Sequence, residues 1–325
     1  MKIGTVGSGF IVTDFLNAAR DVPGVETTAV YSRTMERAEA FAKERGAKLA
    51  FCDRDEFLNS KDFDFVYIAS PNSMHFKWAK DALLAGKNVI CEKPFFSNIK
   101  ETREIIELAY EKNLFLFEAV TVPHLPNYKL LNEHLKDIGD IKVVQINFSQ
   151  YSSRYDKFIN GEKPNVFNPE FSGGALMDIN FYNLYFIVGL FGRPNNLNYF
   201  ANVRDGIDTS GILVLEYDGF LATAVGCKDS KSLNSVQIQG DEGFINIPEE
   251  SSRCISVDIN TKGGSAVYNE QQNAQAHFYE IRDFEEIYSK KDYIAMKNLL
   301  KNSLLVSEML DEARKKAGIV FKADK

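Results

Sequence analysis

Apolar positions in the first 120 residues alternate between two spacings. Short apolar runs with the length of a buried strand are followed by longer stretches in which apolar residues recur every three or four positions. The runs predict strands over residues 2–6, 27–31, 65–69, 88–91 and 114–118. The stretches predict helices over residues 10–20 and 35–45, from about 73 onward, and over 97–112. Strands that alternate with helices build a parallel sheet covered on both faces, so we predict a doubly wound α/β domain.

The pattern changes after Pro123 and Pro126, where short strands separated by turns become the dominant feature. Asp218-Gly219 favours a tight hairpin, because glycine tolerates a positive φ. The predicted elements are helices at 127–135, 175–190, 274–288 and 294–317, a strand at 142–151, and several strands from 197 to 268. This half predicts an open, mostly antiparallel sheet with helices. We therefore divide the chain into a dinucleotide-binding domain, 1–122, and a substrate and oligomerisation domain, 123–325.

Composition narrows the classes of function. A chain of 325 residues with 45% hydrophobic and 26% charged residues is expected to form two globular domains. Its net charge of −7 argues against binding nucleic acid. The four cysteines lack the close spacing of a zinc site or a disulfide framework, so we expect no metal and reduced thiols. With no apolar run of about 18 residues and no leader segment, we expect no membrane association and a cytoplasmic location.

A glycine-rich segment follows the first predicted strand and opens the first helix. In Gly7-Ser8-Gly9-Phe10-Ile11-Val12 the glycines allow the backbone to approach a pyrophosphate, whose charge then meets the helix N-terminus. The segment predicts that Gly7, Gly9, Phe10 and Ile11 bind a dinucleotide. The alternative is a glycine turn with no ligand. Val12 stands where glycine or alanine is usual, which weakens the expectation of close packing between helix and strand.

The end of the second predicted strand indicates which dinucleotide binds. Ser32 and Arg33 stand where a free ribose 2′-hydroxyl would require an acidic residue, and Arg37 follows one helical turn later. Guanidinium groups suit a 2′-phosphate. We predict NADP as the cofactor, with NAD as a possibility, although a solvated arginine at a helix start would give the same sequence.

Two further turns lie at the carboxyl edge of the same predicted sheet. Ser70, Pro71, Asn72 and His75 fall between a strand and a helix and are predicted to line the dinucleotide; for His75, a capping or surface role is the alternative. Glu92-Lys93-Pro94 ends another strand at the edge where open α/β sheets bind ligands. We predict that Glu92 and Lys93 border the cofactor and that the Lys93 ammonium stabilises a developing alkoxide. The alternative is a surface lysine paired with Glu92.

In the second half, Asp178 and Tyr182 are four residues apart in a predicted helix and share one face. A tyrosine whose pKa is lowered by Lys93 could exchange a proton with a hydroxyl or carbonyl. Asp178 would raise that pKa if it acted alone, so we assign it to orienting substrate or Lys93. A helix-capping aspartate before a core tyrosine is the alternative. Arg154, just beyond a strand, could anchor an anionic or hydroxyl-rich substrate.

Taken in order along the chain, these motifs resemble those of the Gfo/Idh/MocA oxidoreductases. The resemblance covers essentially the whole chain and rests on the glycine loop, Ala69-Ser70-Pro71-Asn72, Glu92-Lys93-Pro94, Glu118-Ala119 and the Gly-Gly-x-x-x-Asp element at 173–178. It implies a Rossmann domain followed by an open sheet whose face often forms the oligomer interface, and hence a homodimer or homotetramer. It also implies that Lys93 and Tyr182 are catalytic, with Asp178 nearby.

Many members of the family carry histidine at the position of Tyr182. Tyrosine there makes this chain similar to the branch that contains dimeric dihydrodiol dehydrogenases, NADP-dependent xylose dehydrogenases and glucose–fructose oxidoreductase. Two features depart from the family pattern. Asn180 stands where glycine is usual, and Val120-Thr121-Val122-Pro123-His124-Leu125-Pro126 replaces a segment that in this branch usually carries aromatic, arginine and histidine residues before the proline.

The resulting prediction is an NADP-dependent oxidoreductase that transfers a hydride between the nicotinamide and a sugar, polyol or related alcohol or carbonyl compound. Lys93, Arg154, Asp178 and Tyr182 are its predicted substrate-binding residues. Two alternatives belong to other classes: a dinucleotide-sensing regulator without turnover, and a glycosidase that uses NAD transiently.

Overall fold

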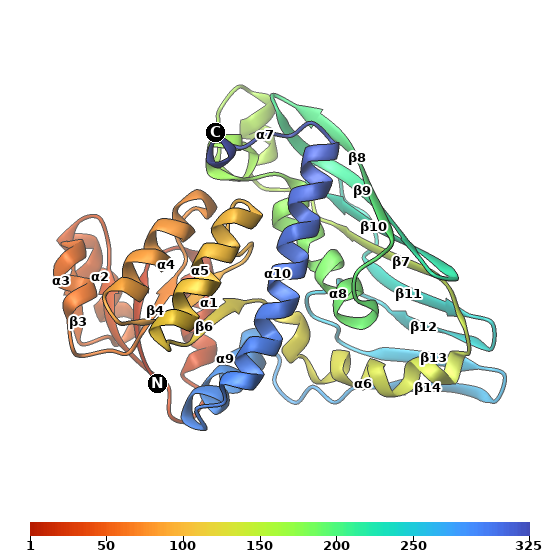
Figure 1. Ribbon diagram of the computed structural model, residues 1–325, viewed down its shortest axis with the longest axis horizontal. Helices are drawn as coiled ribbons and strands as arrows, with labels where there is room; N and C mark the ends of the chain where they lie inside the picture. Colours follow the sequence, from red (N-terminus) through yellow and green to blue (C-terminus); the bar gives the residue numbers. More distant parts are fainter. The chain divides into compact units, whose positions relative to one another are not determined.

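The computed structural model describes all 325 residues and divides into two compact units (Figure 1). The first comprises Met1–Ala119 and His277–Leu304, and the second comprises Val120–Ala276 and Leu305–Lys325. The predicted boundary after residue 122 is close to the first junction. The predicted second domain nevertheless includes residues 277–304, which the structure packs into the first unit.

A six-stranded parallel sheet forms the centre of the first unit, in the order β3-β2-β1-β4-β5-β6. Its strands are β1 (Lys2–Val6), β2 (Glu26–Tyr31), β3 (Leu49–Phe51), β4 (Phe65–Ile68), β5 (Asn88–Glu92) and β6 (Leu116–Ala119). Its connecting helices are α1 (Phe10–Ala19), α2 (Met35–Arg45), α3 (Arg54–Asn59), α4 (His75–Leu84) and α5 (Ile99–Lys112). The predicted doubly wound sheet is confirmed. Only β3 and α3 were not predicted, because each is too short to show a periodic pattern.

Two helices from the end of the chain complete the first core. They are α9 (Ala276–Ser289) and the part of α10 (Tyr293–Lys316) up to Leu304; the rest of α10 belongs to the second unit. The Phe284 ring of α9 stacks on Phe117 of β6 at 4.5 Å, and the Leu116 amide of β6 lies 3.4 Å from Met296 Sδ of α10. All four side chains are buried. The apolar spacing of these helices predicted their existence, but spacing does not specify which core a helix joins.

The strand order reverses between β1 and β4, where the connections leave in opposite directions. In open α/β sheets, ligands bind beyond the carboxyl ends of the strands at this switch point. The glycine loop follows β1 and the Ser70 turn follows β4, and the Ala69 amide donates to the Val6 carbonyl at 3.0 Å. The two turns are therefore neighbours at the ligand-binding edge.

The second unit is built on an eight-stranded sheet in the order β14-β13-β12-β11-β7-β10-β9-β8. Its strands are β7 (Ile141–Ser149), β8 (Asn196–Arg204), β9 (Ile207–Tyr217), β10 (Phe220–Cys227), β11 (Ser235–Gly240), β12 (Gly243–Ile247), β13 (Val257–Thr261) and β14 (Gly264–Tyr268). Only β7 and β10 pair in parallel, so the mostly antiparallel prediction is confirmed. At the predicted hairpin, Gly219 has φ +87° and the rings of Tyr217 and Phe220 stack at 4.6 Å.

Three α-helices of this unit are α6 (Pro126–His134), α7 (Tyr155–Ile159) and α8 (Phe181–Phe191). In Figure 1, α6 and α8 lie on the same side of the eight-stranded sheet.

One helical run, Pro169–Phe191, has the length and composition of a membrane span. The expectation that no stretch would pass this test is therefore wrong. Of its most apolar window, 72% is buried inside the structure, as in the core helix of a globular unit. The run contains α8, whose buried residues form part of the second core.

Candidate active site

The glycine loop has the backbone geometry that a close phosphate contact requires. Gly7 has φ +114°, and a Cβ there would lie 2.8 Å from the Ala69 carbonyl oxygen, so a side chain is excluded. Gly9 is the N-cap of α1 and makes no side-chain cap, and a Cβ added to it would meet no atom within 4 Å. Phe10 is exposed and Ile11 half-buried. The loop and the helix start therefore fit a pyrophosphate.

Val12 does not disturb this arrangement. Its side chain is fully buried and its Cγ2 atom would lie 3.5 Å from a Cβ at Gly7, which is ordinary van der Waals distance. Close packing between α1 and the sheet is thus achieved with valine in place of a smaller residue.

The two predicted arginines flank the glycine loop from the end of β2. Arg37 Nε donates to Ser8 Oγ at 2.9 Å, which attaches α2 to the loop. The Arg33 side chain is exposed. Ser32 is buried, and its amide donates to the Phe51 carbonyl of β3 at 3.0 Å. Two cations beside an uncapped helix start fit a dinucleotide with a 2′-phosphate.

His75 is turned into the interior of the first unit. The ring is 1% exposed; Nε2 lies 2.9 Å from the Ser70 carbonyl oxygen, and Nδ1 lies 3.2 Å from those of Pro94 and Phe95. Burial lowers the pKa of His75, which favours the neutral ring. The side chain predicted to line the dinucleotide therefore holds two turns together instead. Pro71 and Asn72, at the start of the short helix Asn72–Met74, are half-buried.

Lys93 follows β5 and is half-buried, with a cis peptide bond to Pro94. The adjacent Glu92 is 5% exposed, and its Oε1 accepts a hydrogen bond from the Tyr67 hydroxyl at 2.5 Å. Its side chain thus belongs to the core, and only the Glu92 backbone is available for the predicted cofactor contact. The alternative of a surface ion pair between the two residues is wrong, because the Glu92 side chain is not at the surface.

Glu92 belongs to a buried group of ionisable residues beneath the end of β5. Burial raises the pKa of Glu92 to about 7 and that of Glu118 to about 8. His277 Nδ1 lies 2.7 Å from Glu280 Oε1. Burial alone would lower the pKa of His277, but the charge and hydrogen bond of Glu280 outweigh it and raise the pKa to about 9. The positive charge of Lys93 acts against this effect of burial, because it lowers the pKa of both Glu92 and Glu118.

Asp178 and Tyr182 lie where a π-helical turn, Leu176–Asn180, joins α8. Such turns occur frequently at functional sites. A buried residue that was not predicted, Asp208 of β9, fixes the start of the turn: its Oδ2 accepts from the Leu176 amide at 2.6 Å and from the Tyr199 hydroxyl at 2.7 Å. Asp178 is thus not the helix cap that the alternative interpretation proposed.

The departure at Asn180 has a structural explanation. Asn180 Nδ2 donates to the Ala224 carbonyl of β10 at 3.0 Å, and Asn183 Nδ2 donates to the Val225 carbonyl at 2.9 Å. A Cβ at Gly226 would lie 2.5 Å from Asn180 Cβ, so glycine in β10 makes room for asparagine in the helix. These bonds attach the start of α8 to the sheet.

Asp178 has a partner that sequence reasoning missed. The Lys228 ammonium, on the residue after β10, donates to Asp178 Oδ2; the lysine side chain is 8% exposed and that of the aspartate 33%. Tyr182 is half-buried beside Phe148, with ring centroids 6.1 Å apart. No motif pointed to Lys228, because it is separated from Asp178 by fifty positions of sequence.

The structure attaches the Arg154 segment to the same region of the second unit. The Ser152 amide donates to the Lys228 carbonyl at 2.9 Å, and the Arg154 amide to Ser152 Oγ at 3.2 Å. The Arg154 side chain is exposed. The atypical residues 120–126 are mostly buried, and Thr121 Oγ1 donates to the Ser252 carbonyl at 2.7 Å. That segment therefore contributes chiefly to packing.

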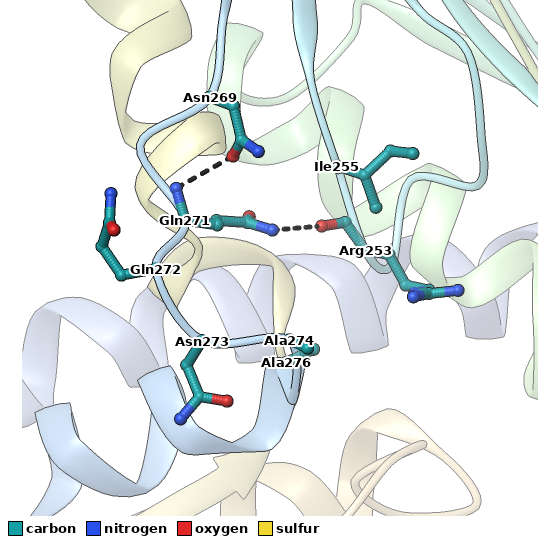
Figure 2. A pocket seen from close by; sticks show the side chains of 8 residues that line it. All are labelled: Arg253, Ile255, Asn269, Gln271, Gln272, Asn273, Ala274 and Ala276. Atoms are coloured by element: carbon teal, nitrogen blue, oxygen red, sulfur yellow. Dashed lines mark hydrogen bonds between the residues drawn. The ribbon is translucent and has the colours of Figure 1, made fainter.

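A surface pocket of about 300 Å³ lies elsewhere in the second unit (Figure 2). Amide side chains from 269–273 and Arg253 line it, and Gln271 bridges the two sides by donating to the Arg253 carbonyl at 3.2 Å and to Asn269 Oδ1 at 3.0 Å. None of the predicted site residues lines this pocket.

Comparison with known protein families agrees with this geometry. Residues 1–120 match the model described as oxidoreductase family, NAD-binding Rossmann fold, and residues 134–246 match the GFO/IDH/MocA C-terminal domain. The chain belongs to the Gfo/Idh/MocA family of oxidoreductases. The first unit is accordingly the NAD-binding domain of the family, which confirms the predicted resemblance.

The similar proteins extend over the full chain. A scyllo-inositol 2-dehydrogenase (NADP(+)) of Bacillus subtilis (strain 168) is 39% identical over 327 residues, which cover 100% of this chain and 99% of the relative. A trans-1,2-dihydrobenzene-1,2-diol dehydrogenase of Sus scrofa is 27% identical, covering 100% and 99%. The solved structure of a 3-ketoreductase from Actinomadura kijaniata with NADP and TDP-benzene has a TM-score of 0.85 at 21% identity, covers 97% of each chain, and shows the same fold.

The buried ionisable group predicts that stability falls as pH rises. Folded-state pKa values near 8 for Glu118 and 9 for His277 exceed the ordinary values of 4.5 and 6.5, so the folded protein binds more protons than the unfolded chain. The Glu118 contribution is full below pH 4.5 and is lost as pH rises through 8. We expect the urea midpoint to fall between pH 6 and 9, and to fall less in Glu118→Gln.

The matched control is Glu111→Gln, which changes an exposed glutamate and should follow the native curve. If the urea midpoint of Glu118→Gln fell with pH as steeply as that of the native protein, the raised pKa of Glu118 would be contradicted.

Proposed function

We propose that the protein is an NADP-dependent dehydrogenase or reductase acting on a secondary hydroxyl, or the matching carbonyl, of a cyclic polyol or sugar. The observation that carries this proposal is the cation at the end of β5: His75 bonds the carbonyl groups of Pro94 and Phe95 and so fixes the backbone beside Lys93 at the ligand-binding edge. The NADP-dependent inositol dehydrogenase among its relatives supports both the cofactor and the substrate class.

The cofactor would be held by residues of the first unit. Gly7, Gly9 and the first amides of α1 receive the pyrophosphate, Arg33 and Arg37 pair with the 2′-phosphate, and the 70–72 turn borders the ribose. The absence of an acidic residue after β2 favours NADP over NAD. When bound, the nicotinamide supplies or accepts the hydride.

The remaining chemistry belongs to this chain's own side chains. The Lys93 ammonium donates a hydrogen bond to the substrate oxygen and stabilises negative charge on it. The Tyr182 hydroxyl exchanges the proton of that oxygen as hydride transfer proceeds. Asp178 accepts hydrogen bonds and orients the substrate, and Arg154 contacts its outer hydroxyl groups. The presence of Lys93, Asp178 and Tyr182 together favours turnover over a purely dinucleotide-sensing role.

We further propose that the protein is a homodimer or homotetramer joined through the eight-stranded sheet. Three exposed apolar side chains occupy neighbouring strands: Phe200 of β8, Ile212 of β9 and Leu221 of β10. Phe200 and Ile212 are direct cross-strand partners. Leu221 lies on the same face but pairs with Glu216, four positions along β9 from Ile212, so the exposed pair of Phe200 and Ile212 is the observation that supports an interface. The cytoplasmic location stays a prediction, to be checked by fractionating the cells that express the chain.

Turnover on a panel of polyols and sugars, followed by NADPH absorbance in both directions, tests the activity. Tyr182→Phe should lower kcat by about 10²–10⁴-fold and leave the Kd for NADPH little changed, because it removes only the proton donor. Phe148→Leu changes a neighbouring ring without removing a proton and serves as the control. Native kcat in Tyr182→Phe would exclude the assigned role.

Arginine substitutions test the cofactor preference. We expect Arg33→Ala and Arg37→Ala each to weaken NADP binding about 10–100-fold, the usual scale for one charge-assisted hydrogen bond, with a much smaller effect on NAD. Lys43→Ala changes an exposed cation of the same helix α2 and should alter neither affinity. Calorimetric titration gives the constants, and equal losses for NADP and NAD would argue against a 2′-phosphate site.

Sedimentation analysis tests the assembly. Ile212→Lys should shift the native oligomer toward monomer, because it places a charge on the apolar face, whereas Leu84→Lys on α4 changes an exposed leucine of the first unit and should not. A native protein that sediments as a monomer at micromolar concentration would refute the interface.

A further inference from the structure

Lys228 bonds the predicted catalytic residue Asp178, and the proposed function gives Lys228 no role. Its backbone is held on both sides: the Lys228 amide donates to the Thr209 carbonyl at 2.8 Å, and its carbonyl accepts from the Ser152 amide at 2.9 Å. Its ammonium is buried and donates to Asp178 Oδ2. Buried lysines are rare unless they are paired, so this pair is a built feature of the site.

Three other carboxylates of this region have their own partners. Asp229 accepts from Thr209 Oγ1 at 2.7 Å and from Ser210 Oγ at 2.8 Å, which turns its carboxylate toward β9. Asp208 is engaged by Leu176 and Tyr199. Asp156, beside Arg154 in the neighbouring segment, accepts from the Tyr151 hydroxyl at 2.6 Å. The Lys228 charge is therefore directed at Asp178.

The ion pair offsets the negative charge that Asp178 brings to the π-helical turn. Asp178 stands four residues before Tyr182, and a carboxylate near a phenol disfavours the phenolate. A tyrosine that exchanges a proton during turnover works best when its two protonation states are close in free energy at the operating pH. An ammonium bonded to the carboxylate offsets the unfavourable charge while it keeps the carboxylate in one orientation.

We propose that Lys228 is a positioning residue that holds the Asp178 carboxylate and cancels its charge beside Tyr182, so that Tyr182 exchanges its proton near neutral pH. This inference rests on the proposed function, because it concerns the same proton transfer. It assigns to the Lys228–Asp178 pair control of the pH range in which the enzyme works.

The test is the pH dependence of kcat for single and double variants of the full-length protein. In Lys228→Met the uncompensated carboxylate should move the alkaline transition of the profile up by about one pH unit, which lowers alcohol oxidation about tenfold at a fixed pH below the transition. In Asp178→Asn the uncompensated ammonium should move the transition down. The double variant Lys228→Met/Asp178→Asn should return it toward the native position, although its kcat is lower.

Opposite shifts with recovery in the double variant separate charge from structure, since a merely structural role would lower kcat without moving the transition in opposite directions. The double variant removes both members of the buried pair and stays informative if Lys228→Met alone does not fold. Lys231→Met removes an exposed lysine of the same loop and should leave the profile unchanged.

An unchanged transition in folded Lys228→Met and Asp178→Asn would overturn the inference. If Tyr182→Phe loses turnover in that same experiment, the proposed function survives and only the role of Lys228 fails. If Tyr182→Phe retains full turnover, the proton transfer itself is wrongly assigned.

Discussion

One buried imidazole holds together the ligand-binding edge of the first unit. His75 lies against the Ser70 carbonyl on one side and the Pro94 and Phe95 carbonyls on the other, so a single side chain packs between the turns that follow β4 and β5, and the neutral ring donates its one N–H to one of them. Buried carbonyl groups without partners are costly, and at strand ends they cannot be satisfied by the sheet itself. The orientation of the Lys93 backbone depends on this contact.

The second unit uses buried polar side chains in the same way. Asp208 caps the π-helical turn, and Asn180 and Asn183 bond the carbonyl groups of β10. Lys228 follows directly at the end of that strand and pairs with Asp178. The residues that set the geometry of Asp178 and Tyr182 are therefore polar and buried, and each bonds either the backbone or an opposite charge. Asn180 and Asn183 are neighbours of this pair in the sequence, whereas Asp208 and Lys228 are distant from it.

Sequence reasoning recovered what local patterns encode. Alternating strands and helices gave the parallel sheet, and the rule that ligands bind at carboxyl strand ends brought the glycine loop, the Ser70 turn and Lys93 to one edge. It could not show that the His75 ring and the Glu92 side chain turn inward, because a motif fixes position and not side-chain direction. Lys228 and Asp208 were missed because pairing across a sheet leaves no periodic signal. The packing of residues 277–304 into the first core was missed for a related reason, since amphipathic spacing does not identify a partner.

The central proposal is that Lys93 and Tyr182 serve the same reaction. A double-mutant cycle on kcat with Lys93→Met, Tyr182→Phe and the double variant measures this most directly. Groups that act as a unit are strongly non-additive, so we predict that the double variant is about as slow as the slower single variant. Losses that multiply would show that the two residues act independently and would contradict the claim.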